Sequence, residues 1–228
     1  MKDTVERLAQ TPPRPALNDT GPARQYLRSY LVQRLVIGLL GLTLPAILVV
    51  KTLQRSGDIE GSLSGYYYTD ARDLFVGALI AVGVFLMTYM VLEKNLDNFF
   101  SLAAGLGALV VALVPTGAPS GVVRFQTLPV WMHFTAAALF IGSLGVISAR
   151  FGYGERRRTD PVATHRVFWS WFHYGCAIVI LLAVLFIVVT HNGFDKSLLV
   201  GESVAVAAFG VSWTAKGSEL FKWLTTTA

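Results

Sequence analysis

The sequence predicts an all-α membrane protein, a bundle of six transmembrane helices with both termini in the cytoplasm. Three observations lead to this fold class. The 228 residues are 54% hydrophobic and only 14% charged, whereas soluble domains carry roughly 25% charged residues. The apolar residues are gathered in six long runs, and the basic residues fall between these runs. Folded in water, such a chain would expose large apolar patches and aggregate, which excludes most soluble classes of protein.

Each of the six runs is long enough to cross a bilayer core roughly 30 Å thick as a helix. The runs are Leu35–Val50 with its flanks, Leu74–Leu92, Asn98–Pro115, Leu128–Ala149, Val167–Thr190 and Leu198–Ala215. Stretches such as Ala177–Val189 are apolar on every face, whereas the strands of a membrane barrel alternate polar and apolar residues. The runs are therefore expected to be helices.

Polar tails flank a six-helix domain at residues 31–217. The first tail, residues 1–30, carries several prolines among charged residues and is expected to be a flexible cytoplasmic segment with a short helix at Asp3–Gln10. The second tail, residues 218–228, is short and also expected to be cytoplasmic. The loops between the runs are too short for a separate soluble domain, so the bundle itself is expected to carry the function.

The distribution of basic residues predicts the orientation. Fourteen lysines and arginines lie before the first run, after the last run and in the loops after the second and fourth runs, against five on the other side. Basic residues favour the cytoplasmic side, and an even number of spans also puts both termini on one side. We expect a multi-pass plasma-membrane protein, in the bacterial inner membrane, in contact with lipids. Its charge of +5 follows the topology and does not indicate nucleic-acid binding.

The polar residues of the outer side are the candidates for a ligand- or ion-binding site. Glu202 and His133 lie four or five residues inside their runs, where an ionisable side chain is costly and normally faces the bundle interior or a partner. Their depths are similar, so a contact between them is geometrically feasible. Asp73 is expected to line the same cavity, and a charged aromatic rim is expected at its mouth, formed by Tyr66, Tyr67, Tyr68, Arg72 and Arg124. The alternatives are a structural hydrogen bond between helices and an ordinary interfacial aromatic belt.

On the inner side, His173 lies among aromatic residues and is expected to be a hydrogen-bonded structural residue rather than a ligand. In the last run, Glu202, Phe209, Trp213 and Lys216 recur at spacings that keep them near one helix face. That face is predicted to point into the bundle. The single cysteine, Cys176, permits no internal disulfide and is expected to be a small buried hydrophobic residue.

One part of the chain resembles an uncharacterised family of bacterial six-span integral membrane proteins of unknown function. The pattern is Ser64-x-Tyr66-Tyr67-x-Thr69-x-x-Arg72-Asp73-x-Phe75-Val76-Gly77, followed by Ala112-Leu113-Val114-Pro115-Thr116 and the stretch Glu202–Lys216. The resemblance covers most of residues 60–217. It implies a shared six-helix fold and brings no assigned activity.

The chain is more weakly similar to the alkaline ceramidase and adiponectin-receptor-like membrane hydrolases, which combine a serine, an aspartate and three zinc-binding histidines. This resemblance implies Ser64, Asp73 and His133 as part of such a set. The chain departs from that family in having six spans and no H-x-x-x-H motif near the C-terminus. Zinc needs three protein ligands around one point, and His133, His191 and Glu202 are the outer-side residues that could supply them.

Three functions follow as expectations. The first is an outward-facing polar cavity that binds or conducts a small ion or a lipophilic ligand. The second is a membrane-embedded, metal-dependent lipid hydrolase with zinc as its cofactor, and the third is a non-catalytic accessory subunit. The sequence contains no phosphate-binding glycine loop, H-E-x-x-H or G-x-S-x-G motif, so it leaves open whether the protein is an enzyme. A second copy or a membrane complex are the protein partners considered.

Overall fold

The computed structural model describes residues 22–88, 96–118, 128–157 and 165–226. This part of the chain contains only helices: α2 (Pro22–Ser56), the short 3-10 helix η1 (Ser64–Tyr68), α3 (Arg72–Thr88), α4 (Leu96–Leu113), α5 (Val130–Arg157), α6 (Arg166–Thr190) and α7 (Ser197–Thr226). The all-α class is therefore confirmed. The expected helix at Asp3–Gln10 and the rim residue Arg124 lie outside the described residues.

Five helices are long and apolar enough to cross a membrane, which supports a membrane protein. These segments are Ser29–Ser56, Leu96–Leu113, Val130–Arg157, Arg166–Thr190 and Ser197–Ser218. The remaining helix, α3, has 17 residues within the described range. Three helices extend well beyond the predicted runs: α2 begins at Pro22, α5 continues to Arg157 and α7 continues to Thr226.

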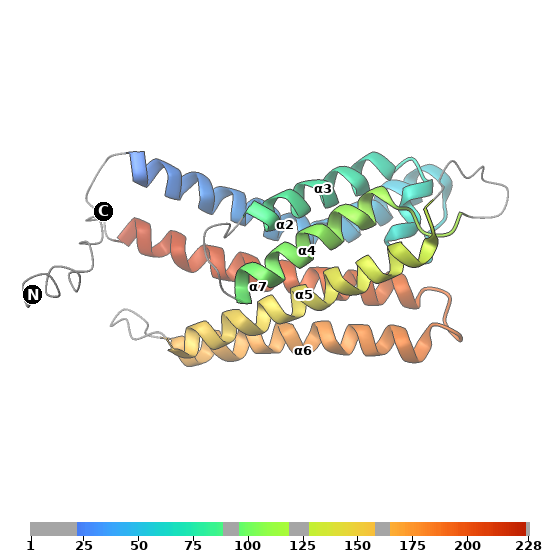
Figure 1. Cartoon of the computed structure of the whole chain (residues 1–228). Coiled ribbons are helices and arrows are strands. Elements are labelled where there is room, and N and C mark those ends of the chain that lie inside the picture. The colour runs from blue at the N-terminus through green and yellow to red at the C-terminus, as the bar shows by residue number, and fades with distance from the viewer. Residues whose placement is uncertain (1–21, 89–95, 119–127, 158–164, 227–228) are drawn as a thin grey trace, which may run out of the picture.

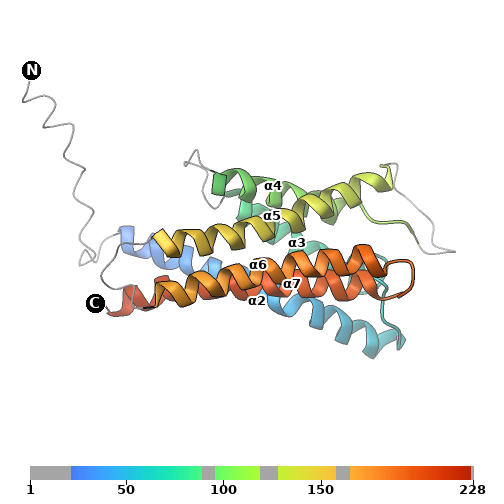
Figure 2. The same cartoon turned by 90° about the horizontal axis from the view of Figure 1, so that it is seen from below.

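The six helices stand side by side in a ring. From α3 to α7 each helix packs on the next one in the sequence, and α2 packs on α7 (Figures 1 and 2). The contact between α2 and α3 is less extensive, and α5 also touches α7 across the ring. The start of α2 and the end of α7 lie at one end of the bundle, and η1 lies at the other (Figure 1). We call these the inner end and the outer end, following the predicted topology.

Glycines let the first and last helices approach each other closely. A Cβ atom at Gly210 would lie 2.6 Å from the Leu42 nitrogen and 2.7 Å from the Gly38 oxygen. A Cβ at Gly41 would lie 3.4 Å from the Gly210 Cα atom. Small residues at such crossings allow the extensive backbone contact that holds helices together in a bilayer.

The interior face predicted for the last helix is confirmed. Phe209 and Trp213 are buried at 3% and 0% exposure, and Glu202 and Lys216 are partly buried on the same helix. Cys176, on α6, is also buried, as expected. By contrast, α6 presents a row of apolar side chains outward, among them Leu181, Leu182, Val188 and Val189. Such a surface suits contact with lipid.

Candidate functional site

The helix η1 covers part of the outer end of the bundle. Local hydrogen bonds from hydroxyl side chains shape it: the Gly65 amide donates to the Ser62 hydroxyl at 3.0 Å, and the Thr69 hydroxyl donates to the Tyr66 carbonyl at 3.0 Å. The Ala71 amide in turn donates to the Thr69 hydroxyl at 3.1 Å. Serine and threonine favour turns through exactly this kind of local bond. The sequence predicts an aromatic rim here, and the 3-10 helix is an addition to that prediction.

Three long-range hydrogen bonds fasten the segment before η1 to the start of α7. The Leu63 amide donates to Glu202 Oε2 at 2.7 Å. The Leu199 amide donates to the Gly61 carbonyl at 2.9 Å, and Lys196 Nζ donates to the Ile59 carbonyl. Residues 59–63 are therefore held against the start of α7 by the backbone groups of every second residue, Ile59, Gly61 and Leu63.

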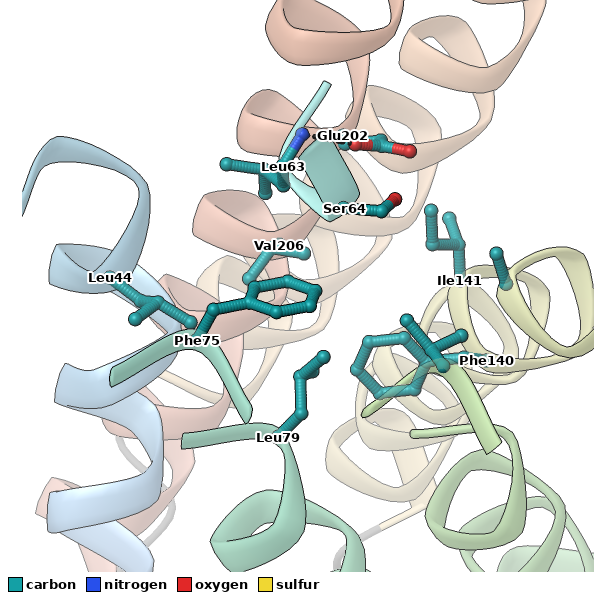
Figure 3. A pocket seen from close by; sticks show the side chains of 11 residues that line it. Leu44, Leu63, Ser64, Phe75, Leu79, Phe140, Ile141, Glu202 and Val206 are labelled. Atoms are coloured by element: carbon teal, nitrogen blue, oxygen red, sulfur yellow. Dashed lines mark hydrogen bonds between the residues drawn. The ribbon is translucent and has the colours of Figure 1, made fainter. Parts of the chain in front are cut away.

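A cavity lies beneath η1, inside the ring of helices (Figure 3). About 50 Å³ of it is open to water-sized molecules, which is room for several waters or a small ligand group. Five helices and the η1 segment contribute its lining: Leu44, Leu63, Ser64, Phe75, Leu79, Val111, Ala137, Phe140, Ile141, Glu202 and Val206. The two polar members, Ser64 and Glu202, come from neighbouring segments at the outer end, and the other nine are apolar.

Glu202 is the ionisable residue of this lining. Its carboxylate accepts the Leu63 amide at 2.7 Å and also interacts with the Ser64 amide. These amides belong to the residue before η1 and to the first residue of η1, where backbone N–H groups lack partners within the helix. Glu202 therefore acts as a cap for η1 from a helix that is distant in the sequence.

His133 is buried, at 1% exposure, but it is not part of the cavity lining. Its Nδ1 atom lies 2.6 Å from the Val114 carbonyl, so it joins the start of α5 to the end of α4. The feasible contact between His133 and Glu202 is not formed within the described part of the chain, because each side chain bonds a different backbone group. This contact fits the alternative of a structural hydrogen bond between helices better than it fits a residue that lines the cavity.

The remaining rim residues stabilise the outer segment and are not among the lining residues. Arg72 lies over the Tyr67 ring, 4.4 Å from Cζ to the ring centroid, and donates to the Tyr67 hydroxyl at 2.7 Å. The Tyr68 hydroxyl donates to the Thr116 carbonyl at 2.6 Å. Asp73 is exposed in the first turn of α3, where a carboxylate complements the helix dipole.

Tyr66 differs from its two neighbours because it is fully buried at 0% exposure. Burial raises the pKa of its phenol. The Glu60 backbone amide opposes this change, and the negative charge of the Glu60 side chain adds to it. The hydroxyl forms no well-aligned hydrogen bond with the described residues. Tyr66 therefore packs as a neutral aromatic side chain.

The three candidate zinc ligands do not come together. His191 is exposed at the end of α6, and its Nδ1 atom lies 2.9 Å from the Val188 carbonyl. His133 and Glu202 have the separate partners described above. Within residues 22–88, 96–118, 128–157 and 165–226, no three His, Cys, Asp or Glu side chains form a group that could hold a metal ion.

The inner half of the bundle holds a buried polar cluster, of which only His173 was predicted from the sequence to be a structural residue. Arg34, Glu155, His173 and Lys216 come from four different helices, and the first three are at most 2% exposed. Lys216 forms an ion pair with Glu155. His173 Nδ1 lies 2.9 Å from the Ser212 hydroxyl, as expected of a structural histidine.

Aromatic rings surround this cluster. Arg34 Cζ lies 5.1 Å from the Phe151 ring centroid and 4.7 Å from that of Trp213. Helical spacing is the signal that could have found the buried charges. Arg34 precedes Gly38 and Gly41 at intervals of four and seven, and Glu155 follows Gly152 and Ser148 at intervals of three and seven.

Comparison with known proteins finds no family model, no curated protein and no solved structure that matches the chain. The site is therefore interpreted from its own chemistry.

Proposed function

We propose that the outer half of the bundle binds a small, membrane-soluble ligand in the cavity beneath η1. The observation that carries this proposal is the lining itself, nine apolar residues with Glu202 and Ser64 together at one end. A lining with apolar walls and a few convergent polar groups is typical of small-molecule sites. An ion pathway would need several oxygen ligands around one point, and the lining offers one carboxylate and one hydroxyl.

The position of the cavity also supports a lipophilic ligand. It lies within a ring of six helices, five of which are long and apolar enough to span a bilayer. Leu44 of α2 and Phe75 and Leu79 of α3 line it, and these two helices make the less extensive contact that closes the ring. A ligand dissolved in the bilayer would reach the cavity most easily along this seam.

A cavity-filling substitution tests the proposal. Ala137→Phe places a ring in the lining, whereas Leu139→Phe on the same helix adds the same ring at a position that is 48% exposed. Cyclohexanol serves as a neutral lipophilic probe, and the thermal unfolding temperature of the protein in lipid nanodiscs is the readout. Ligand binding to the folded state raises this temperature.

We expect cyclohexanol to raise the unfolding temperature of the native protein and of Leu139→Phe, and to leave that of Ala137→Phe unchanged. The same response in all three proteins would overturn the proposal, because it would show that the probe acts on the lipid or on the protein surface. No comparable observation among the described residues favours the alternatives, a zinc hydrolase and an accessory subunit.

A further inference from the structure

The cavity contains a carboxylate that has no cationic partner within the described part of the chain. Glu202 forms no ion pair there with a lysine, arginine or histidine. Lys196 lies one and a half helical turns before it but donates to the Ile59 carbonyl instead. A carboxylate within a membrane-spanning helix is costly unless it is paired. A ligand with a cationic group could supply the partner for this carboxylate.

The backbone of η1 holds this carboxylate in a fixed position. The amides of Leu63 and Ser64 bind it, and Leu63 is itself buried at 6% exposure. An ionised carboxylate has about four acceptor positions, so two amide bonds leave acceptor capacity for another donor. Ser64 is the other polar residue of the lining, and its hydroxyl can both donate and accept.

Below the carboxylate the walls are hydrocarbon and aromatic. Phe75 reaches in from α3 and Phe140 from α5, with Leu79 between them at greater depth (Figure 3). The part of a ligand that lies against these walls should carry no polar groups, because a polar group there would lose its hydrogen bonds to water. The cavity thus has an acceptor at its outer end and an apolar remainder.

We propose that the ligand is a lipophilic amine. This inference rests on the proposed ligand-binding function and names the chemical class. The protonated nitrogen binds the Glu202 carboxylate and donates to the Ser64 hydroxyl, and the hydrocarbon body packs on Phe75, Leu79 and Phe140. A ligand with a carboxylate head is disfavoured by repulsion from Glu202.

Three probes with the same ring and different head groups test this inference: cyclohexylamine, cyclohexanol and cyclohexanecarboxylate. Near neutral pH the amine is protonated, because its pKa resembles that of lysine, about 10.4. For the native protein in nanodiscs we expect cyclohexylamine to bind roughly tenfold more tightly than cyclohexanol, the gain of about 1.4 kcal/mol that a charge-assisted hydrogen bond supplies. Cyclohexanecarboxylate is expected to bind least.

Substitutions at Glu202 distinguish the binding of the charged head group from the binding of the ring in the apolar part of the cavity. Glu202→Gln should abolish the tenfold preference, so that the amine and the alcohol bind with similar affinity, and Glu202→Asp should retain the preference. The matched control is Glu60→Gln, which removes a carboxylate from the same outer segment but not from the lining. It should change none of the three affinities.

The outcomes distinguish the two proposals. If cyclohexanol binds and is lost in Ala137→Phe, but the amine is no tighter or Glu202→Gln keeps the preference, the amine assignment is overturned and the cavity function stands. If none of the probes binds the native protein, both proposals fall together. If Glu202→Gln does not assemble, the comparison of amine with alcohol in the native protein and in Glu202→Asp still decides the assignment.

Discussion

The ion pair between Glu155 and Lys216 joins α5 to α7 in the inner half of the bundle. Glu155 is 1% exposed. Removing a cationic partner from a buried carboxylate costs about 3–5 kcal/mol, so we predict that Lys216→Met lowers the free energy of unfolding by that amount. Unfolding by SDS titration in mixed micelles measures the change.

A double variant is the control for this prediction. Replacing a buried ion pair by apolar residues is often neutral, so adding Glu155→Leu to Lys216→Met should recover much of the lost stability. A single variant as stable as the native protein would show that the pair contributes nothing to folding.

Tyr66 makes the outer segment sensitive to alkaline pH. Burial raises the pKa of its phenol above that in the unfolded chain, which is about 10. The neutral form is therefore favoured by folding, and the stability it contributes is present below pH 10 and lost as the pH rises through the raised pKa. We predict that Tyr66→Phe retains its folded state to higher pH than the native protein does.

Circular dichroism during a titration from pH 8 to pH 12 would show the difference. Tyr67→Phe is the matched control, because the Tyr67 hydroxyl accepts a hydrogen bond from Arg72 in a half-buried position. It should lose structure at the same pH as the native protein. Equal alkaline transitions in the native protein and Tyr66→Phe would contradict the prediction.

At the level of single residues, depth in a run predicted which polar side chains would need partners but not which partners they would find. Glu202 and His133 both bond backbone groups, and these belong to residues 139 and 19 positions away. Such pairings depend on how helices pack, which hydropathy does not encode. Arg34 was counted among the topology-setting charges because it borders an apolar run, yet it is buried beneath α7.

At the level of elements, the crossing of α2 and α7 depends on the absence of side chains at its centre. A methyl group at Gly210 would meet backbone atoms of Gly38 and Leu42 at 2.7 Å or less, and backbone cannot yield as a flexible side chain does. We predict that Gly210→Ala lowers the free energy of unfolding by about 1–3 kcal/mol, the usual cost of overpacking.

Gly142→Ala on α5 is the comparison, because no atom lies within 4 Å of a Cβ added there. It should be neutral or raise stability by up to about 1 kcal/mol, since alanine favours a helix over glycine. Both variants can be measured by the same SDS titration. Equal effects of the two substitutions would argue against a close crossing.

Helix type was predictable from the sequence, and helix ends were not. Runs of apolar residues predicted every described α-helix, because the bilayer requires them. The runs mark the apolar core, however, and a helix continues wherever its backbone bonds continue, as α5 does from Ala149 to Arg157. The helix η1 was missed because its five residues depend on serine and threonine hydroxyls and on a carboxylate from α7.

For the whole molecule, the predicted orientation can be tested with single cysteines in a Cys176→Ala background. Gly193 is exposed at the outer end and Gly154 is exposed at the inner end. We predict that a membrane-impermeant thiol reagent labels Gly193→Cys in intact cells and labels Gly154→Cys only after lysis. Labelling in the opposite pattern would invert the topology, and labelling of both in intact cells would contradict a six-span arrangement.

The ring was beyond sequence reasoning for a simple physical reason. Hydropathy gives the number and length of the helices, but which helices touch depends on the shapes of their side chains. The sequence did not indicate that Gly38 and Gly41 face Gly210. The cavity beneath η1 also results from this arrangement, since five helices and η1 supply its lining.

The pairing of α2 with α7 places a condition on how the protein is made. Ribosomes add about 5–20 residues per second, and α7 begins 141 residues after α2 ends. The first helix thus waits on the order of ten seconds in the bilayer, its glycine-lined face covered only by lipid or by an insertion factor, until the last helix emerges. A chain stopped before residue 197 would lack the helix that packs on that face.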